Sequence, residues 1–481
     1  MPADRGPIQE QSLINFIIAV PALRLDSGTE QPMNTKIQLS DHFTYRRLLR
    51  FVLPSIVMMI FTSIYGVVDG LFVSNFVGKT PFAAVNLIMP FLMMLGCLGF
   101  MIGTGGSAIV AMTLGEGKKD LANAYFSMMV YVTIAAGILL AILGIITVPA
   151  VSVMLGAQGE MLSHCILYGR ILLPAVPAFM LQNVFQSFLV TAEKPQLGLA
   201  VTVGAGLTNI ILDALLVAVF PMGIVGASLA TTISQMVGGL VPLVYFCKSS
   251  SGLLHLGRPC FYGKILVKTC LNGSSELMTN LSMSLVNILY NFQLMRFAGE
   301  DGIAAYGVIM YVNFIFIAMF VGYSIGSAPL TGYHYGAHGL DEVRNLLHKS
   351  LVITGTAGVV LTGLAEILAF PLARIFVGYD PELYAMTGRG FMIYSLSFLI
   401  MGFNIYGSAY FTSLGNGAVS AAISFLRTLL FQVVAVMGLP FLIGLDGIWL
   451  AIVAAELPAL AVTGYFFVST RKRYFPAFPA P

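Results

Sequence analysis

Long apolar segments follow one another along almost the whole chain, and they constrain its fold more than any other feature. A helix that crosses a lipid bilayer needs about 20 predominantly apolar residues. Charged residues make up only 9% of the sequence, whereas soluble domains carry about 25%. We therefore predict an all-α integral membrane protein with twelve transmembrane helices. The predicted spans are 49–77, 84–113, 123–148, 161–190, 197–220, 223–246, 264–297, 303–333, 345–371, 383–412, 418–442 and 447–469.

Basic residues are distributed unevenly over the connections between these spans. Loops with an excess of Lys and Arg lie on the cytoplasmic side of a membrane protein. Only Lys79, Arg296 and Arg374 flank predicted spans on one side. Because the number of spans is even, both termini are then expected in the cytoplasm. The basic residues of the other side are Arg46, Arg47, Arg50, Lys118, Lys119, Lys194, Lys248, Arg258, Lys264, Arg344, Lys349, Arg471, Lys472 and Arg473.

The two halves of the chain share an internal repeat. Eight residues in and beside the second predicted span recur without a gap 221 positions later. Six helices in each half leave both halves in the same orientation, so a pseudo-twofold axis should lie along the membrane normal. We expect two pseudo-symmetric six-helix bundles around a central cleft. The repeated residues are Gly78, Ala83, Ala84, Ile88, Met89, Gly105, Gly115 and Asp120, and then Gly299, Ala304, Ala305, Ile309, Met310, Gly326, Gly336 and Asp341.

The polar ends and joints complete the expected organisation. Residues 1–45 are expected to form a poorly ordered cytoplasmic extension, because the apolar stretch from Leu13 to Val20 is too short to span. Met33 is an alternative start, because the residues after it are typical of a cytoplasmic lead-in. We predict an N-terminal bundle over 46–246, a cytoplasmic linker over 247–263, a C-terminal bundle over 264–470 and a short cytoplasmic tail over 471–481.

Acidic side chains inside the predicted spans are candidate functional residues. A charge at the centre of an inserted helix costs about 2.5–3.5 kcal/mol, so it indicates a function by default. Asp69, Asn209, Asp213 and Thr231 fall at one depth of the first bundle, judged from a rise of about 1.5 Å per residue. Asp69, Asn209 and Asp213 are candidate Na⁺ ligands. Alternatively, one carboxyl group holds a proton, because two close carboxylates cannot both ionise cheaply. A set of polar residues that bond between helices is the structural alternative.

Charged residues of the second bundle form another candidate site. Glu276 and Arg427 are expected at similar depth, so they could pair and leave Glu456 as a further acid. A structural ion pair and a substrate site both fit this set. Pro54 removes a backbone donor one turn into the helix that carries Asp69. A hinge and a static kink are both consistent with that position.

Other functional classes lack their motifs. The sequence has no phosphate-binding loop, His-Glu-x-x-His or nucleophile elbow, which argues against an enzyme. His334 and His338 have helical metal spacing without a third ligand, so no metal site other than one for Na⁺ is expected. The net charge of +3 is spread over the loops and does not indicate nucleic-acid binding. The five cysteines lack metal-ligand spacing and are expected to be core residues.

Five short segments carry a resemblance to a known family of proteins. They are Tyr65–Asp69, Gly115–Gly117, Leu207–Asp213, Gly223–Thr231 and Gly447–Trp449. They resemble the multidrug and toxic compound extrusion (MATE) family, more narrowly its bacterial MepA-like branch, and the resemblance covers about residues 45–470. It implies cation-coupled export without a cofactor, with Asp69, Asn209, Asp213 and Thr231 as the cation site and Glu276 as a membrane-embedded acid. The predicted span 383–412 lacks the Asp of some relatives, which argues against a second cation site.

The residues and the resemblance together predict an antiporter of the bacterial cytoplasmic membrane. It would export amphipathic, cationic drugs or metabolites in exchange for H⁺ or Na⁺, as a monomer in contact with membrane lipid. A flippase for lipid-linked oligosaccharides would need several basic residues within the membrane, and the chain offers Arg427 and Arg170. A non-transporting receptor is the alternative of another class, and it would bind a ligand without ion-dependent flux.

Overall fold

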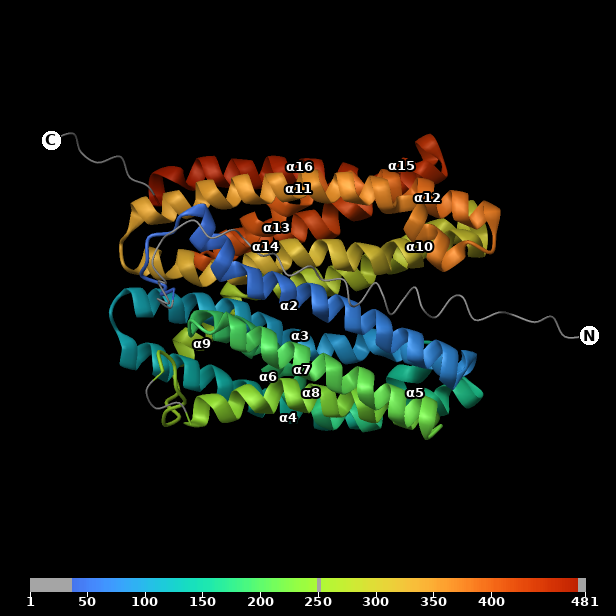
Figure 1. Cartoon of the computed structure of the whole chain (residues 1–481), viewed down its shortest axis with the longest axis horizontal. Coiled ribbons are helices and arrows are strands. Elements are labelled where there is room, and N and C mark those ends of the chain that lie inside the picture. The colour runs from blue at the N-terminus through green and yellow to red at the C-terminus, as the bar shows by residue number, and fades with distance from the viewer. Residues whose placement is uncertain (1–36, 249–251, 475–481) are drawn as a thin grey trace, which may run out of the picture. The chain divides into compact units, whose positions relative to one another are not determined.

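Helices account for almost all of the described chain. The structure is a computed structural model that describes residues 37–248 and 252–474 (Figure 1). Most of the expected N-terminal extension, up to residue 36, and the end of the expected tail, from residue 475, lie outside the described residues. Residues 37–44 precede the first described helix, and contacts join the chain from Ile37 onward into one unit.

The first half contains six apolar segments separated by short joints. Proline occupies the first turn of α7, where its missing N–H leaves no hydrogen bond unmade. The helices are α2 (Tyr45–Phe72) continued by the π-helical turn η1 (Val73–Val77), α3 (Lys79–Gly115), α4 (Lys119–Met154), α5 (Gly159–Leu172) joined through η2 (Leu173–Ala175) to α6 (Val176–Thr191), α7 (Pro195–Asp213) continued by the π-helical turn η3 (Ala214–Val219), and α8 (Gly223–Lys248).

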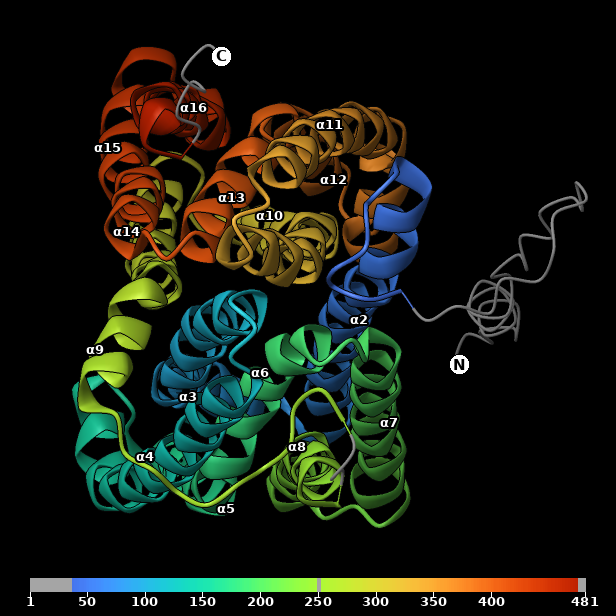
Figure 2. The same cartoon turned by 90° about the vertical axis from the view of Figure 1, so that its left-hand side faces the viewer.

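The second half repeats this pattern after a non-helical linker at residues 252–262. Figure 2 shows α3 to α8 on one side and α10 to α16 on the other, with α2 beside α7. The helices are α9 (Gly263–Asn272), α10 (Ser274–Gly336), α11 (Leu340–Val377), α12 (Pro381–Ser395), α13 (Phe398–Ser413), α14 (Gly417–Phe425) joined through the π-helical turn η4 (Leu426–Phe431) to α15 (Gln432–Ile443), and α16 (Leu445–Tyr474).

Twelve spans can be counted in the described ranges, as predicted. Ten helices are long and apolar enough to cross a membrane, and the pair α12 and α13, bent by 50°, forms an eleventh span. The helix α10 has 63 residues and contains a non-helical residue, Gly299, with φ of 64°. Since one span needs about 20 residues, Gly299 divides α10 into two spans and raises the count to twelve. The predicted all-α membrane fold is confirmed.

Three predicted spans contain breaks that the apolar pattern did not indicate. The seventh is divided between α9 and α10 at Gly273, and the tenth is divided between α12 and α13. The fourth is interrupted at η2, where Pro174 lacks the N–H that a continuous helix requires. In contrast, α2 runs through Pro54 without a break. The hinge at Pro54 therefore stays a prediction.

Two glycines of the internal repeat make backbone contacts that the repeat relates to each other. A Cβ atom on Gly115 would lie 2.0 Å from the carbonyl oxygen of Tyr333, and a Cβ atom on Gly336 would lie 2.0 Å from that of Met112. The 221-residue repeat relates Gly115 to Gly336 and Met112 to Tyr333, so each contact is the counterpart of the other. Only glycine fits at such a contact, so α3 and α10 cross in direct backbone contact. The contact supports the expected pseudo-twofold relation of the halves.

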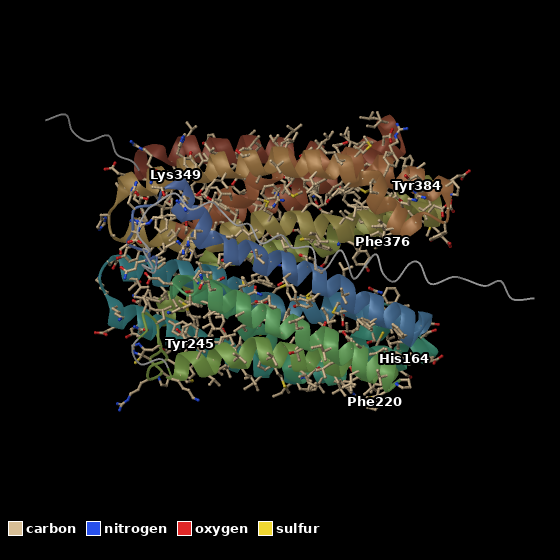
Figure 3. The ribbon with its side chains drawn as sticks, in the orientation of Figure 1. His164, Phe220, Tyr245, Lys349, Phe376 and Tyr384 are labelled. Atoms are coloured by element: carbon tan, nitrogen blue, oxygen red, sulfur yellow. The ribbon has the colours of Figure 1, made fainter. Side chains whose placement is uncertain are left out.

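The crossing lies at one end of the helices, which we call the basic end. It is the end at which α3 and α6 finish and α11 begins. Lys349 and Tyr245 lie toward this end in Figure 3, whereas His164, Phe220, Phe376 and Tyr384 lie toward the opposite end. Along the helices between the two ends, large apolar side chains face outward, as lipid contact requires. Examples are Leu139, Ile146, Ile211 and Ile367.

Candidate cation site and central cleft

The four residues predicted from the first bundle lie together in the structure. Asp69 belongs to α2, Asn209 and Asp213 to α7, and Thr231 to α8. Asn209 Nδ2 and Thr231 Oγ1 each lie 3.5 Å from Asp69 Oδ1, at the long limit of a hydrogen bond. The Asp69 and Asp213 carboxyl groups are near enough to interact electrostatically. We call these four residues the cation site.

Glycines bring the three helices of the cation site close together. A Cβ atom on Gly206 of α7 would lie 2.5 Å from the ring of Phe61 on α2. A Cβ atom on Gly226 of α8 would lie 2.7 Å from the carbonyl oxygen of Leu216 in η3. Such small residues allow close helix approach in membranes. The short polar side chains of the site can therefore reach one another across α2, α7 and α8.

Several oxygen atoms of the cation site have no hydrogen-bond donor. Asp213 is fully buried and Asn209 is 2% exposed. Among the described residues, both carboxyl oxygens of Asp213 and the amide oxygen of Asn209 have no partner. Burying such groups without a partner costs several kcal/mol. A bound cation or a proton would satisfy them, so the arrangement fits the chemistry of cation binding.

Thr231 offers a further oxygen ligand. Its hydroxyl group lies 3.1 Å from the carbonyl oxygen of Ala227, which is closer than its contact with Asp69. A hydroxyl group carries one hydrogen, and when the shorter bond to Ala227 uses it, the lone pairs of Thr231 Oγ1 remain available to a cation. Asp69 and Thr231 are only partly buried. They are therefore the members of the site through which an ion would enter.

Sequence reasoning missed the π-helical turns beside the charged residues. The turn η1 begins four residues after Asp69, and η3 begins directly after Asp213. The N–H of Val73 bonds to the carbonyl oxygens of both Asp69 and Gly70. Such turns are frequent at functional sites because they displace side chains from the regular helical positions. Apolar periodicity carries no signal for a single turn of this kind.

Two tyrosines near the cation site were also missed. Tyr168 of α5 is 1% exposed and interacts with Thr231 and Asp69. Tyr65 precedes Asp69 by one helical turn and interacts with it. The spacing of four residues could have identified Tyr65 as a neighbour on the same helix face. Tyr168 comes from another helix, and its sequence position gives no such signal.

A cleft of about 350 Å³ lies between the two halves, within the ~300–1,000 Å³ of typical ligand pockets. It is lined by residues of α2, α3 and α6 and, more extensively, of α10 and α12 to α16. Glu276 lines it, as do Tyr290 and Tyr306, whose rings stack at 4.8 Å. The four residues of the cation site do not line it. The cation site and the cleft are therefore separate.

The predicted pairing in the second bundle is wrong. Arg427 pairs with Glu456 rather than with Glu276, and Arg427 Nε lies 2.7 Å from Glu456 Oε1. Glu456 is 1% exposed, whereas Glu276 and Arg427 both line the cleft. The π-helical turn η4 contains Arg427 and offsets its side chain from the position that a regular helix would give. Depth along the helix could not show that offset.

Residues 37–44 form a strap that connects both halves at the basic end. The Leu39 N–H donates to Glu193 Oε1 at 2.7 Å, in the joint between α6 and α7. The Phe43 N–H donates to Glu342 Oε1 at 2.9 Å, in the first turn of α11. His42 Nδ1 lies 2.6 Å from the other oxygen of Glu342. With the backbone contact of α3 and α10, the strap joins the two halves at the basic end, an arrangement that we call closed.

Comparison with known proteins identifies the family. A family model described as MatE matches residues 54–215 and 277–437, once in each half and over more than half of the chain. The chain belongs to the MATE family. MATE proteins are transporters and not enzymes, so the expectation that the chain is no enzyme is confirmed. With twelve apolar spans, it is a multi-pass membrane protein.

The most similar relatives include bacterial export proteins. The multidrug export protein MepA of Staphylococcus saprophyticus is 25% identical over 428 residues, which cover 87% of this chain and 92% of the relative. MepA of Staphylococcus haemolyticus is 23% identical over 437 residues, 89% of this chain and 94% of the relative.

Solved structures confirm the fold. An outward-facing multidrug resistance MATE transporter superposes with a TM-score of 0.84 at 22% identity, over 90% of this chain and 96% of the other. A MATE structure in a straight conformation gives the same TM-score and identity, over 90% and 97%.

Proposed function

We propose that this MATE protein is a cation-coupled antiporter that exports amphipathic, cationic drugs or metabolites. The observation that carries the proposal is the cation site, where Asp213 is fully buried without a hydrogen-bond donor among the described residues. A buried carboxyl group needs a proton or a cation. Relatives named multidrug export proteins support small-molecule export as the role.

The helix α2 offers a physical connection between the cation site and the cleft. Met59 and Ser63 of α2 line the cleft, and Asp69 lies further along the same helix. Ser63 Oγ also donates to the carbonyl oxygen of Phe314 on α10 at 3.1 Å. Binding of H⁺ or Na⁺ at Asp69 would change the packing of α2 and thereby the shape of the cleft. In this mechanism external cation binding lowers the affinity for substrate.

The cleft has the chemistry that suits an amphipathic cation. Glu276 makes no described side-chain hydrogen bond, whereas the charge of Arg427 is paired with Glu456. One carboxylate is therefore left to pair with a cationic group. Tyr290, Tyr306 and Phe314 supply aromatic surface beside it, and aromatic faces attract organic cations.

Available ion gradients are large enough to drive such export. A tenfold gradient supplies about 1.4 kcal/mol, and each net charge moved adds about 2.3 kcal/mol per 100 mV. In our proposal the protein works as a monomer in the bacterial cytoplasmic membrane, with both termini and the basic end in the cytoplasm. The N-terminal bundle over 46–246 binds the coupling ion, and the C-terminal bundle over 264–470 supplies most of the cleft.

Efflux of ethidium from proteoliposomes tests the proposal. The purified chain is reconstituted, and dye efflux is followed under an imposed Na⁺ gradient and then under a pH gradient. We expect efflux under one gradient, and loss of this efflux in Asp69→Asn. The matched control is Asp341→Asn, an exposed acid at the basic end, which should behave as wild type. Normal efflux by Asp69→Asn would refute the coupling role.

A further inference from the structure

Arg427 lines the cleft and is held there by a single hydrogen bond in the described structure. The π-helical turn η4 carries it, and its side chain is 13% exposed. In the described structure Arg427 makes one hydrogen bond, from its Nε to Glu456 Oε1 at 2.7 Å. A guanidinium group has five N–H donors in a fixed plane. The Nε contact uses one of them and leaves those of Nη1 and Nη2.

In the described structure Glu456 contacts Arg427 through Nε alone, and its carboxylate is held on its other side. Its second oxygen, Oε2, accepts from Asn404 Nδ2 at 2.6 Å. Asn404 is oriented in turn, because its Oδ1 accepts from Thr463 Oγ1 at 2.9 Å. Glu456 is 1% exposed and Asn404 is fully buried. The chain of hydrogen bonds therefore fixes the carboxylate as an anchor for one edge of the guanidinium group.

The free edge of Arg427 borders the cleft. Arg427 is among the lining residues, as are Ser424 and Thr428 of the same segment. Two parallel N–H donors match the two oxygens of a carboxylate or the oxygens of a phosphate or sulfonate. Because Glu456 already balances the charge, the group is stable in the membrane without a further anion. It is thus able to bind an anionic group reversibly.

The opposite charge is available in the same cleft. Glu276 lines it and makes no described hydrogen bond through its carboxyl group. The stacked pair Tyr290 and Tyr306 supplies an aromatic surface in the same cavity. The cleft therefore holds a guanidinium group anchored on one edge, a carboxyl group without a described hydrogen bond, and a stack of rings. That set matches a molecule that carries both charges on an aromatic body.

We propose that Arg427 binds the anionic group of zwitterionic aromatic amphiphiles, whose cationic group pairs with Glu276. The inference rests on the proposed export function and deepens it, because it assigns one residue to the acidic group and another to the cationic group of the ligand. Arg427 and Glu276 then set specificity separately. Loss of Arg427 should affect only ligands with an acidic group, whereas loss of Glu276 should affect every cationic ligand.

Equilibrium binding of two related dyes tests the inference. Rhodamine B carries a carboxylate and a cationic ring system, and its ethyl ester carries the same ring system without the negative charge. Binding to the purified full chain is measured by fluorescence polarisation. We expect Arg427→Gln to weaken rhodamine B about tenfold, the effect of losing one charge-assisted contact, and to leave the ester within twofold. Glu276→Gln should weaken both dyes.

Two further variants separate this role from a structural one. Arg427→Gln leaves the buried Glu456 without its counter-charge, so the double variant Arg427→Gln/Glu456→Gln removes both charges and should show the same selective loss. Arg389→Gln breaks an exposed ion pair with Asp446 outside the cleft and is the matched control. It should bind both dyes as wild type.

Selective loss in the double variant supports the inference. Equal weakening of both dyes, unchanged binding of rhodamine B, or no binding of rhodamine B to the wild type would overturn it. Binding with the expected selectivity but without ion-driven flux would refute the antiporter proposal and leave the role of Arg427 as a binding residue.

Discussion

At the scale of single residues, the cation site is defined by atoms that lack partners. Asp69 has two neutral neighbours at hydrogen-bond distance, whereas Asp213 has no donor within the described chain. The two acids therefore differ in their exposure and in the number of hydrogen-bond donors around their carboxyl groups. Asp69, which is partly exposed, would meet the ion first, and the buried Asp213 would hold it.

Replacing Thr231 tests whether the site binds the ion through neutral oxygens. Thr231→Ala should lower the affinity for the coupling ion about tenfold, because a lost oxygen contact is worth about 1–1.5 kcal/mol. The concentration of ion that gives half-maximal efflux reports this affinity. Thr208→Ala is the control, since in the part of the chain that the structure describes Thr208 Oγ1 bonds only within its own helix, to the carbonyl oxygen of Gly204. Equal half-maximal ion concentrations for Thr231→Ala and Thr208→Ala would exclude Thr231 as a ligand of the ion.

Sequence reasoning located the residues of the cation site but not all of their contacts. Asn209 and Asp213 are four residues apart, so their common helix face followed from helix geometry. The partner of Arg427 did not follow, because a π-helical turn changes the direction of a side chain without altering the apolar pattern. Tyr168 was missed since its contact depends on packing between helices.

At the scale of elements, the halves are joined by backbone contact and by a strap. The glycine crossing of α3 and α10 is the firmest of these joints, because no side chain separates the two helices. The apolar pattern predicted twelve spans, and the repeat predicted which glycines correspond. The breaks at Gly273 and between α12 and α13 lie inside segments long enough for one span, so segment length did not reveal them. The dipeptide Asn272-Gly273 is a local turn signal that could have indicated the first break.

A methyl group at the crossing should destabilise the closed basic end. Gly336→Ala would place its Cβ atom 2.0 Å from the carbonyl oxygen of Met112, so the helices must separate. Overpacking of this kind costs about 1–3 kcal/mol. Thermal unfolding of the purified protein should show a lower midpoint. The control is Gly363→Ala in α11, where a Cβ atom meets nothing within 4 Å. Equal midpoints would contradict the direct contact.

The strap should bias the protein toward the conformation with a closed basic end. Glu342 accepts from the Phe43 N–H and contacts His42, and a hydrogen bond to a charged group is worth about 1.5–3 kcal/mol. Glu342→Ala should therefore raise the population with an open basic end about tenfold. Spin labels at Gln196 and His348, both exposed at that end, would report a longer distance.

The control for the strap is Glu300→Ala, an exposed acid outside the strap. It should leave the distance between the two labels unchanged. An unchanged distance in Glu342→Ala as well would show that the glycine crossing alone holds the basic end closed. That result would show that the strap does not stabilise the closed basic end.

At the scale of the whole molecule, the sites that we propose for ion and substrate lie in different places. The cation site lies among α2, α7 and α8, whereas the cleft lies between the halves, and α2 contributes to both. Coupling must then pass through a change in helix packing instead of direct competition for one carboxylate. Linkage makes such coupling reciprocal: if the ion expels the substrate, the substrate must also expel the ion.

Substrate-driven ion movement is the most direct test of this account. Proteoliposomes with no initial ion gradient are loaded with ethidium and diluted, and internal pH and Na⁺ are recorded during dye efflux. We expect uptake of one of these ions at a fixed ratio to the dye released, and no such uptake in Asp69→Asn. Dye efflux by the wild type without movement of either ion would contradict it.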